Sequence, residues 1–336
     1  MRHEFLQVAV SGRADERGFQ HGQILADRIE RTVEFYTRIF AQPDSVLFES
    51  ADHFKRKIRE FNGEYATEIE SIAEGAGLDS LYIYALNARS ELLSLKTNEC
   101  TAICFQKTGI LGQNWDWASV LEPLTVLMRI EYPNGHVIQM ITEPGIIGKI
   151  GLNSSGIGVC LNILRIKGQL DGLPVHVVLR AILDSQSIDE AKIAVEKAGH
   201  GKASNILVAD RHGNCFDIEF ARNRSLTINP KQMFVHKNHY IGEHINPNAG
   251  IFRCSYARKQ TSEEKIKALT THSVEDMKSI LLDRSHGEFP INRRYTPDDV
   301  IEEMGTVCSI IMDLPNQTIH LKRGNTVDTN FSRYTL

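Results

Sequence analysis

Residues 100–117 read CTAICFQKTGILGQNWDW, and this stretch divides the chain into two parts of different character. Two mainly apolar runs, 101–105 and 110–115, flank a Lys-Thr-Gly turn, a pattern typical of two short strands joined as a hairpin. Upstream, apolar residues recur at helical spacing in three segments: 19–41, 54–72 and 81–92. We therefore predict that a helical segment, residues 1–99, precedes a sheet that begins at residue 100.

Downstream of the hairpin, strand patterns and helix patterns come in blocks. Helices are predicted over residues 174–198 and 262–284, and Ser187 and Ser273 have the spacing of capping boxes. Strands are predicted at 126–132, 136–142, 157–163, 205–210, 215–220, 306–313 and 318–322. Blocks of this kind favour an α+β fold with helices layered on largely antiparallel sheets. Because the chain shows no internal repeat or linker, we expect a single domain over residues 1–336.

The composition limits the classes of partner. Among 336 residues, 38 Lys and Arg face 42 Asp and Glu, and no basic block resembles the footprint of a nucleic-acid-binding protein. No run approaches the roughly 18 uninterrupted apolar residues of a membrane span. The N-terminus lacks the apolar core of a secretory signal. We expect a cytoplasmic protein that binds neither nucleic acid nor membrane, and the sequence leaves its oligomeric state open.

The reactive residue types narrow the candidate chemistry. Six cysteines are too few and too scattered for a disulfide framework, so most are expected to be buried thiols. His236 and His239 lack a second pair of zinc-type ligands, and residues 145–151 lack the phosphate-loop spacing. We expect no metal and no bound cofactor. The residue pattern leaves Cys100 as either a core thiol or a nucleophile, and a papain-like pairing with a histidine stays open.

Several segments, in the same order along the chain, resemble the acyl-CoA:6-aminopenicillanic acid (isopenicillin N) acyltransferase family. They are Cys100–Cys104 with Gly112–Trp117, Gly18–Gly22, Ile72–Gly77, Ala85–Glu91, Thr142–Gly151 and His236–His239. The resemblance implies an autoproteolytic N-terminal-nucleophile (Ntn) hydrolase with a four-layer αββα sandwich of antiparallel sheets. It also implies cleavage between Glu99 and Cys100. The products would be a helical α segment, 1–99, and a catalytic β segment, 100–336, which remain associated.

Elementary acid–base chemistry explains why such a cleavage would be useful. A thiol has a reference pKa near 8.5, whereas a free α-amino group titrates at about 7.7 to 8.0. Releasing the amine of Cys100 therefore places a base beside its own sulfur, which is one way to activate a nucleophile. The same sulfur would attack the Glu99 carbonyl in the precursor and a substrate acyl group in the mature enzyme.

The resemblance also implies roles for individual residues. Asn238 is similar to the family's oxyanion-hole asparagine, Asp116 to the carboxylate that orients the cysteine and supports processing, and Asn162 to a second site asparagine of hydrolase relatives. Supporting positions are expected at Thr101, Gln113 and Asn114. His21, Arg89 and Glu91 are expected to hold the helical segment together rather than to perform chemistry.

The sequence departs from the family pattern at several positions. Glu99 precedes the nucleophile where the fungal enzyme has glycine, and Gln113 stands where the hydrolase relatives carry arginine. Around residues 220–221 and 304–305 the chain has Ala and Met where the fungal enzyme has Ser and Arg. Penicillin biosynthesis is therefore not implied by the resemblance.

Together these observations predict a self-processing amidohydrolase. It would cleave a small N-acyl amide through a Cys100 thioester, with water as the acceptor. One alternative is an N-acyltransferase that uses acyl-CoA as a substrate. A second alternative is a non-catalytic binding protein in which the bond between Glu99 and Cys100 stays intact.

Overall fold

Two β-sheets pack face to face in the computed structural model, which describes residues 4–93, 100–164, 172–199, 201–221, 224–242, 253–327 and 331–336. The first sheet has the strand order β1 (Leu6–Ser11), β4 (Val126–Glu131), β5 (Val137–Thr142), β6 (Ile150–Asn153), β7 (Ile157–Ile163), β8 (Ser204–Asp210), β9 (Cys215–Ala221) and β10 (Arg224–Ile228). The second has the order β11 (Met233–His236), β2 (Thr101–Phe105), β3 (Ile110–Ala118), β13 (Glu302–Asp313), β14 (Thr318–Arg323) and β15 (Ser332–Thr335), with β12 (Thr296–Asp298) paired to β13. Short 3-10 turns, η1 (Gln106–Thr108) and η2 (Ser119–Leu121), follow β2 and β3.

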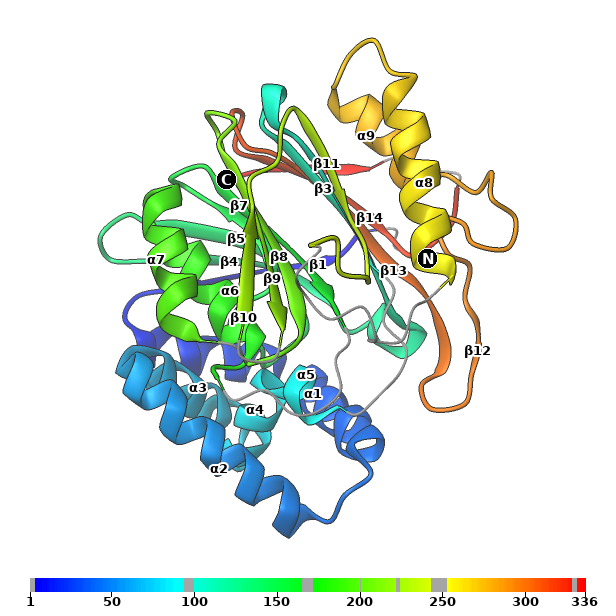
Figure 1. Ribbon diagram of the computed structural model, residues 1–336. Helices are drawn as coiled ribbons and strands as arrows, with labels where there is room; N and C mark the ends of the chain where they lie inside the picture. The colour runs from blue at the N-terminus through cyan, green and yellow to red at the C-terminus, as the bar shows by residue number, and fades with distance from the viewer. Residues whose placement is uncertain are drawn as a thin grey trace.

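Helices cover the outer faces of both sheets (Figure 1). Helices α6 (Val175–Asp184) and α7 (Ile188–Ala198) pack on β6, β7 and β8 of the first sheet. Helices α8 (Arg253–Lys267) and α9 (Val274–Leu281) pack on β11, β3 and β13 of the second. The N-terminal helices pack on one another: α1 (Ala14–Phe40), α2 (Asp44–Phe61), α3 (Gly63–Ala76), α4 (Ser80–Asn87) and α5 (Arg89–Leu92). This layering confirms the predicted α+β, αββα architecture.

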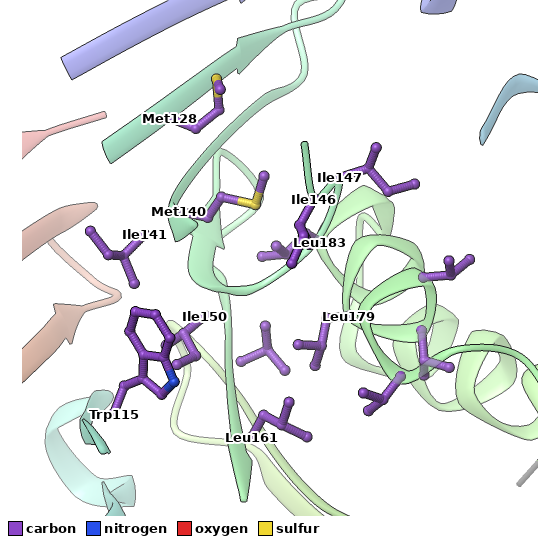
Figure 2. Packing of buried hydrophobic residues seen from close by; sticks show 14 of the residues in the cluster. Trp115, Met128, Met140, Ile141, Ile146, Ile147, Ile150, Leu161, Leu179 and Leu183 are labelled. Carbon is purple, nitrogen blue, oxygen red and sulfur yellow. The ribbon is translucent and has the colours of Figure 1, made fainter. Parts of the chain in front are cut away.

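The space around and between the sheets is filled by apolar side chains (Figure 2). Met140 and Ile150 of the first sheet and Trp115 of the second are all buried, and Leu179 packs into the same cluster from α6. All nine residues of β3 are buried, because this central strand is covered on both faces. A strand covered on both faces reads as a nearly continuous buried run, which is why residues 110–118 stand out in the sequence.

Alternation along β3 sends neighbouring side chains to opposite faces of the second sheet. Gln113 donates to the carbonyl of Leu161 on β7, in the space between the sheets. Asn114 points the other way and donates to the carbonyls of Leu281 (2.8 Å) and Ile291 (3.0 Å), at and beyond the end of α9. The central strand is thus attached to both of its neighbouring layers through side-chain amides.

The structure corrects the predicted elements in several places. Residues 1–99 are not purely helical, because β1 precedes α1 and pairs with β4 in parallel, an exception to the antiparallel pattern. Its apolar signal is weak, since Val8 and Val10 are its only buried residues among the six. The predicted helices 174–198 and 262–284 are each two helices. Strands β6, β10, β11, β12 and β15 were also not predicted.

The predicted helix starts are confirmed at both serines. The Ser187 hydroxyl accepts from the Glu190 N–H, and Ser273 and Asp276 form a reciprocal capping box. These contacts satisfy amide donors that a helix start leaves free. Of the helices in the described ranges, none is both long enough and apolar enough to cross a membrane.

Candidate active site

Cys100 lies at the start of β2 and is 6% exposed. Its backbone N–H donates to Asn238 Oδ1 over 2.8 Å, and its carbonyl oxygen accepts from Arg258 Nη1 over 3.2 Å. Glu99, the other residue of the predicted cleavage bond, lies outside the described residues. The candidate nucleophile is therefore held on both sides of its own backbone by side chains that are distant in the sequence.

Strand β11 brings Asn238 to this position. It pairs with β2 so that His236 lies opposite Ala102, and the chain continues past the end of β2 toward Cys100. The Asn238 side chain donates through Nδ2 to the Ile163 carbonyl over 3.0 Å, so its Oδ1 faces Cys100. An amide carries two N–H donors. The second N–H of Asn238 has no partner among the described residues and is available to a substrate oxygen.

Asp116 approaches Cys100 from β3. The backbone N–H of Asp116 interacts with the Cys100 sulfur, and this interaction lowers the pKa of the thiol. Its Oδ1 accepts from Thr306 Oγ1 over 2.7 Å, across the pairing of β3 with β13. The carboxylate is 1% exposed, so both contacts are shielded from water.

Two buried basic side chains, Arg258 and Lys237, complete the surroundings of Cys100. Arg258 on α8 reaches Thr101 Oγ1 (3.3 Å) and Asn238 Oδ1 (3.3 Å), in addition to the Cys100 carbonyl. Lys237 Nζ donates to Thr101 Oγ1 over 2.7 Å. Burial, followed by the charge of Arg258, lowers the pKa of Lys237 well below its usual value. Thr101, expected as a supporting residue, thus carries the hydroxyl that links both basic side chains to the start of β2.

Comparison with known proteins places this chain in a family. The family model of acyl-coenzyme A:6-aminopenicillanic acid acyl-transferase matches residues 104–328. The 40 kDa form of the acyl-coenzyme A:6-aminopenicillanic-acid-acyltransferase of Emericella nidulans is 30% identical over 252 residues, covering 71% of this chain and 70% of the relative. The chain belongs to the acyl-coenzyme A:6-aminopenicillanic acid acyl-transferase family. As a member of this family it is an acyl-transfer enzyme.

A solved structure agrees with this assignment at the level of the fold. Penicillin V acylase from Agrobacterium tumefaciens has a TM-score of 0.50 at 13% identity, covering 70% of this chain and 86% of that chain. A mutant of the conjugated bile acid hydrolase from Clostridium perfringens has a TM-score of 0.48 at 10% identity, covering 71% and 92%. The fold of this acyltransferase-family chain is that of the Ntn hydrolases.

In this family member the Cys100 thiol is strongly held in its neutral form. Burial, with a smaller contribution from the Asp116 carboxylate, raises its pKa to about 11. The Asp116 N–H and the charges of Arg258 and Lys149 act in the opposite direction without overcoming burial. At neutral pH the thiol therefore needs a base before it can act as a nucleophile.

The remaining predicted residues occupy distinct positions. The side chain of Asn162 on β7 donates to Asn205 Oδ1 (2.9 Å) and to the His236 carbonyl (3.4 Å), and no described contact joins it to Cys100. Gln113 both donates to and accepts from the backbone of Leu161, and so connects the two sheets. Asn114 attaches β3 to the region of α9, on the other face of the sheet.

Neither histidine of the 236–239 segment interacts with Cys100 in the described contacts. His236 Nε2 lies 2.8 Å from Glu219 Oε1, and His239 Nδ1 lies 2.7 Å from Ser255 Oγ. Within the described ranges, no group of three or more His, Cys, Asp or Glu residues could hold a metal ion. The two histidines support the strand that carries Asn238.

The helical segment is attached to the rest of the chain through residues that were expected to be structural. Arg89 pairs with Glu143 over 2.8 Å, the Gly145 N–H donates to His21 Nε2 over 3.0 Å, and Glu91 accepts from the Val175 N–H over 2.8 Å.

Sequence reasoning did not identify Arg258. It lies in a polar helix 158 residues from Cys100, and no local motif distinguishes it from other exposed-looking arginines.

Proposed function

We propose that this protein is a self-processing N-terminal-cysteine amidohydrolase that cleaves a small N-acyl amide through a Cys100 thioester. The observation that carries the proposal is the hydrogen bond of 2.8 Å from the Cys100 backbone nitrogen to Asn238 Oδ1. Cleavage before Cys100 would turn this nitrogen into a free amine that already has an acceptor to hold it. The amine would lie beside a thiol that needs a base.

The first reaction is self-cleavage. Cys100 Sγ attacks the Glu99 carbonyl carbon, the bond from that carbon to the Cys100 nitrogen breaks, and the nitrogen takes a proton. Water then hydrolyses the resulting thioester, which leaves a carboxylate on Glu99 and restores the thiol. We assign Arg258, which contacts the Cys100 carbonyl, and Asp116, whose N–H interacts with the sulfur, to positioning this step.

Turnover repeats the chemistry on a substrate. The free amine of Cys100 accepts the thiol proton, the sulfur attacks the acyl carbon, and the leaving amine departs with a proton. The second N–H of Asn238 stabilises the oxyanion, a role in which one preorganised donor commonly contributes about 10² to 10³ in rate. Water then releases the acid from the thioester. Because Asn162 reaches Asn205 and the His236 carbonyl, we assign it to supporting β11.

A second candidate is an N-acyltransferase in which an amine, rather than water, accepts the acyl group. The relative from Emericella nidulans bears the name of an acyl-CoA-dependent acyltransferase, and Cys100 is 6% exposed, which limits competition from bulk water. Acyl-CoA would act here as a substrate and not as a resident cofactor.

Two further points belong to the proposal. The processed fragments, 1–99 and 100–336, stay together as one domain, supported by the ion pair of Arg89 with Glu143 and other contacts across the cleavage point. We place the protein in the cytoplasm, because its six cysteines are free thiols of the kind that a reducing compartment maintains.

The experiment measures the intact mass of the purified protein and of Cys100→Ala under denaturing conditions, with N-terminal sequencing of any large fragment. We expect two fragments, the larger beginning at Cys100, in the wild-type protein only. A panel of N-acyl amides, assayed with and without an acceptor amine, then separates free acid from new amide as the product. A full-length wild-type chain without amidase activity would contradict the proposal and favour the binding protein.

A further inference from the structure

Two cysteines that the proposed reaction does not use, Cys104 and Cys215, are in contact with each other. Their side chains are hydrogen-bonded, and this contact, followed by burial, raises the pKa of Cys215. Both residues are free thiols, Cys104 fully buried and Cys215 half-buried. The pair therefore connects β2, the strand that follows Cys100, with β9 of the other sheet.

The alternation of side chains along each strand explains why the two thiols meet. On β2, Cys104 lies in the main core cluster, whereas Phe105 lies in the separate cluster formed with α8 and α9. On β9, Cys215 shares a face with Glu219, four residues further on. Glu219 reaches across to His236 on β11 of the second sheet over 2.8 Å. Both cysteines therefore point into the space between the sheets.

The backbones also converge near this pair. Gly213, in the turn before β9, packs so closely on Gln106, the residue after β2, that a Cβ built on the glycine would lie 2.5 Å from the Gln106 carbonyl oxygen. Each of these residues is two positions away from a cysteine of the pair. A disulfide needs Cα atoms about 4.4 to 6.8 Å apart, closer than the usual spacing of about 10 Å between stacked sheets. The convergence at Gly213 supplies this closer approach.

We propose that Cys104 and Cys215 form an oxidative modification site, which a small-molecule disulfide such as oxidised glutathione converts into a disulfide between the two sheets. The sulfur of the half-buried Cys215 attacks the oxidant, forms a mixed disulfide and releases one glutathione thiol. The Cys104 sulfur then attacks the Cys215 sulfur and displaces the second glutathione. Two protein thiols are oxidised, one glutathione disulfide is reduced to two thiols, and the two protein protons end on these thiols.

Such a disulfide would be a reversible clamp on the sandwich, beyond the proposed amidohydrolase activity. It would close the chain from residue 104 to residue 215, and crosslinks that close long loops are expected to stabilise most. It would also fix β2 to β9 only four residues from Cys100. In a reducing compartment the pair stays a dithiol, and the disulfides that do form there are usually transient and redox-sensing.

The experiment equilibrates the purified protein in glutathione buffers with a stepwise increasing oxidised fraction. Free thiols are then blocked in denaturant, and peptide mass mapping locates each disulfide. We expect the link between Cys104 and Cys215 to exceed the mixed disulfide of Cys215 with glutathione by at least about tenfold, because the second step is intramolecular. The oxidised protein should unfold at a temperature at least about 3 °C above that of the reduced protein.

Cys104→Ala and Cys215→Ala should each abolish the link and the thermal shift. Cys160→Ala is the matched control, because this buried thiol on β7 also interacts with Cys215, and it should leave both readouts unchanged. If Cys104→Ala fails to fold, the peptide map of the wild-type protein still decides.

Three results would overturn the inference: a link from Cys215 to Cys160, a mixed disulfide that persists at Cys215, or no oxidation of the pair in any buffer. Neither cysteine of the pair takes part in self-cleavage, so the two proposals fail separately. An unprocessed chain that forms the link would refute the amidohydrolase alone, whereas a processed amidase without the link would refute the modification site alone.

Discussion

Two buried polar clusters in this protein shift the pKa of their acidic group in opposite directions. In the nucleophile cluster, formed by Cys100, Asp116, Asn238 and Arg258, burial raises the pKa of Cys100 to about 11 and keeps the thiol neutral. In the anchor cluster, formed by Tyr36, Arg89, Glu143 and Lys149, Glu143 receives hydrogen bonds from Tyr36, Arg89 and Lys149. Burial alone would raise the pKa of Glu143, but its cations outweigh burial and lower it to about 2.

The difference follows from how completely each cluster compensates its charges. Breaking a buried ion pair is costly because the remaining charge has no water around it. The anchor cluster is therefore suited to holding elements together. The nucleophile cluster keeps the Cys100 thiol uncharged, so the thiol can act as a nucleophile only after a base removes its proton. Strong burial alone does not distinguish a structural cluster from a catalytic one.

Lys149 is a member of the anchor cluster that also acts on Cys100 of the nucleophile cluster. It pairs with Glu143, its Nζ lies 3.1 Å from the centre of the Trp115 ring, and its charge lowers the pKa of Cys100. The anchor cluster also spans the predicted cleavage point, because Tyr36 and Arg89 precede Glu99 whereas Glu143 and Lys149 follow it. The cluster can therefore keep the two fragments together and place a cation near the nucleophile.

The largest effect is expected from removing the nucleophile. Cys100→Ala should abolish self-cleavage and reduce amide hydrolysis by about 10⁴-fold or more, as when the nucleophile of a catalytic set is lost. Intact mass and product formation measure both. Cys215→Ala, which removes a half-buried thiol on β9, is the control and should still be processed. Fragments in the Cys100→Ala sample would show that another group performs the cleavage.

Breaking the anchor cluster should destabilise the fold. Glu143→Gln leaves Arg89 and Lys149 without their carboxylate and should lower the free energy of unfolding by about 3 to 5 kcal/mol. Denaturant unfolding at neutral pH measures this change. Glu275→Gln removes an exposed ion pair with Lys278 and should cost less than about 1 kcal/mol. Similar costs for the two variants would remove the proposed distinction between anchor and surface pairs.

The pairing of Glu143 also predicts a pH dependence. Its folded-state pKa is lowered, so its contribution to stability is fully present above the ordinary carboxyl range and is lost as the pH falls toward about 2. The wild-type protein should therefore lose stability more steeply than Glu143→Gln between about pH 4.5 and pH 2. Unfolding curves of both proteins across this range provide the measurement. Parallel curves would mean that the carboxyl is not selectively stabilised by its cations.

Asn238, which belongs to the nucleophile cluster, and Asn162, which lies outside it, should differ in their effect on the rate. Asn238→Ala should reduce the rate of amide hydrolysis by about 10² to 10³, because it removes the donor proposed for the oxyanion. Asn162→Ala should have an effect below about tenfold, since its side chain reaches Asn205 rather than Cys100. Initial rates with the same amide compare them. Equal losses would assign Asn162 a direct part in the reaction.

The smallest effect is expected at Arg258. Arg258→Gln removes a charge that lowers the pKa of Cys100, so that pKa should rise further and alkylation of the thiol should require a higher pH. The rate of iodoacetamide labelling against pH measures the shift. Arg258→Lys should restore part of the wild-type profile because it retains the charge. An unchanged profile in Arg258→Gln would mean that Arg258 has a purely structural role.

Much of the fold was accessible from local patterns. The helical spacing before residue 93, the hairpin after Cys100 and the caps at Ser187 and Ser273 all arise from interactions between residues close in sequence. Strand β1 was missed because two of its six residues face the core, too few for a clear alternating signal. The break between α6 and α7 was missed although residues 184–187 are all polar and Ser187 has the spacing of a capping box.

The sequence alone determined the α+β class, the family and the position of the candidate nucleophile, since these depend on periodicity and on motifs that are contiguous in the chain. Only the tertiary structure decided that Arg258 contacts Cys100, that Asn162 faces Asn205, and that Glu143 joins the two predicted fragments. These contacts join residues far apart in the chain. Their convergence depends on the packing of whole layers, which no local pattern encodes.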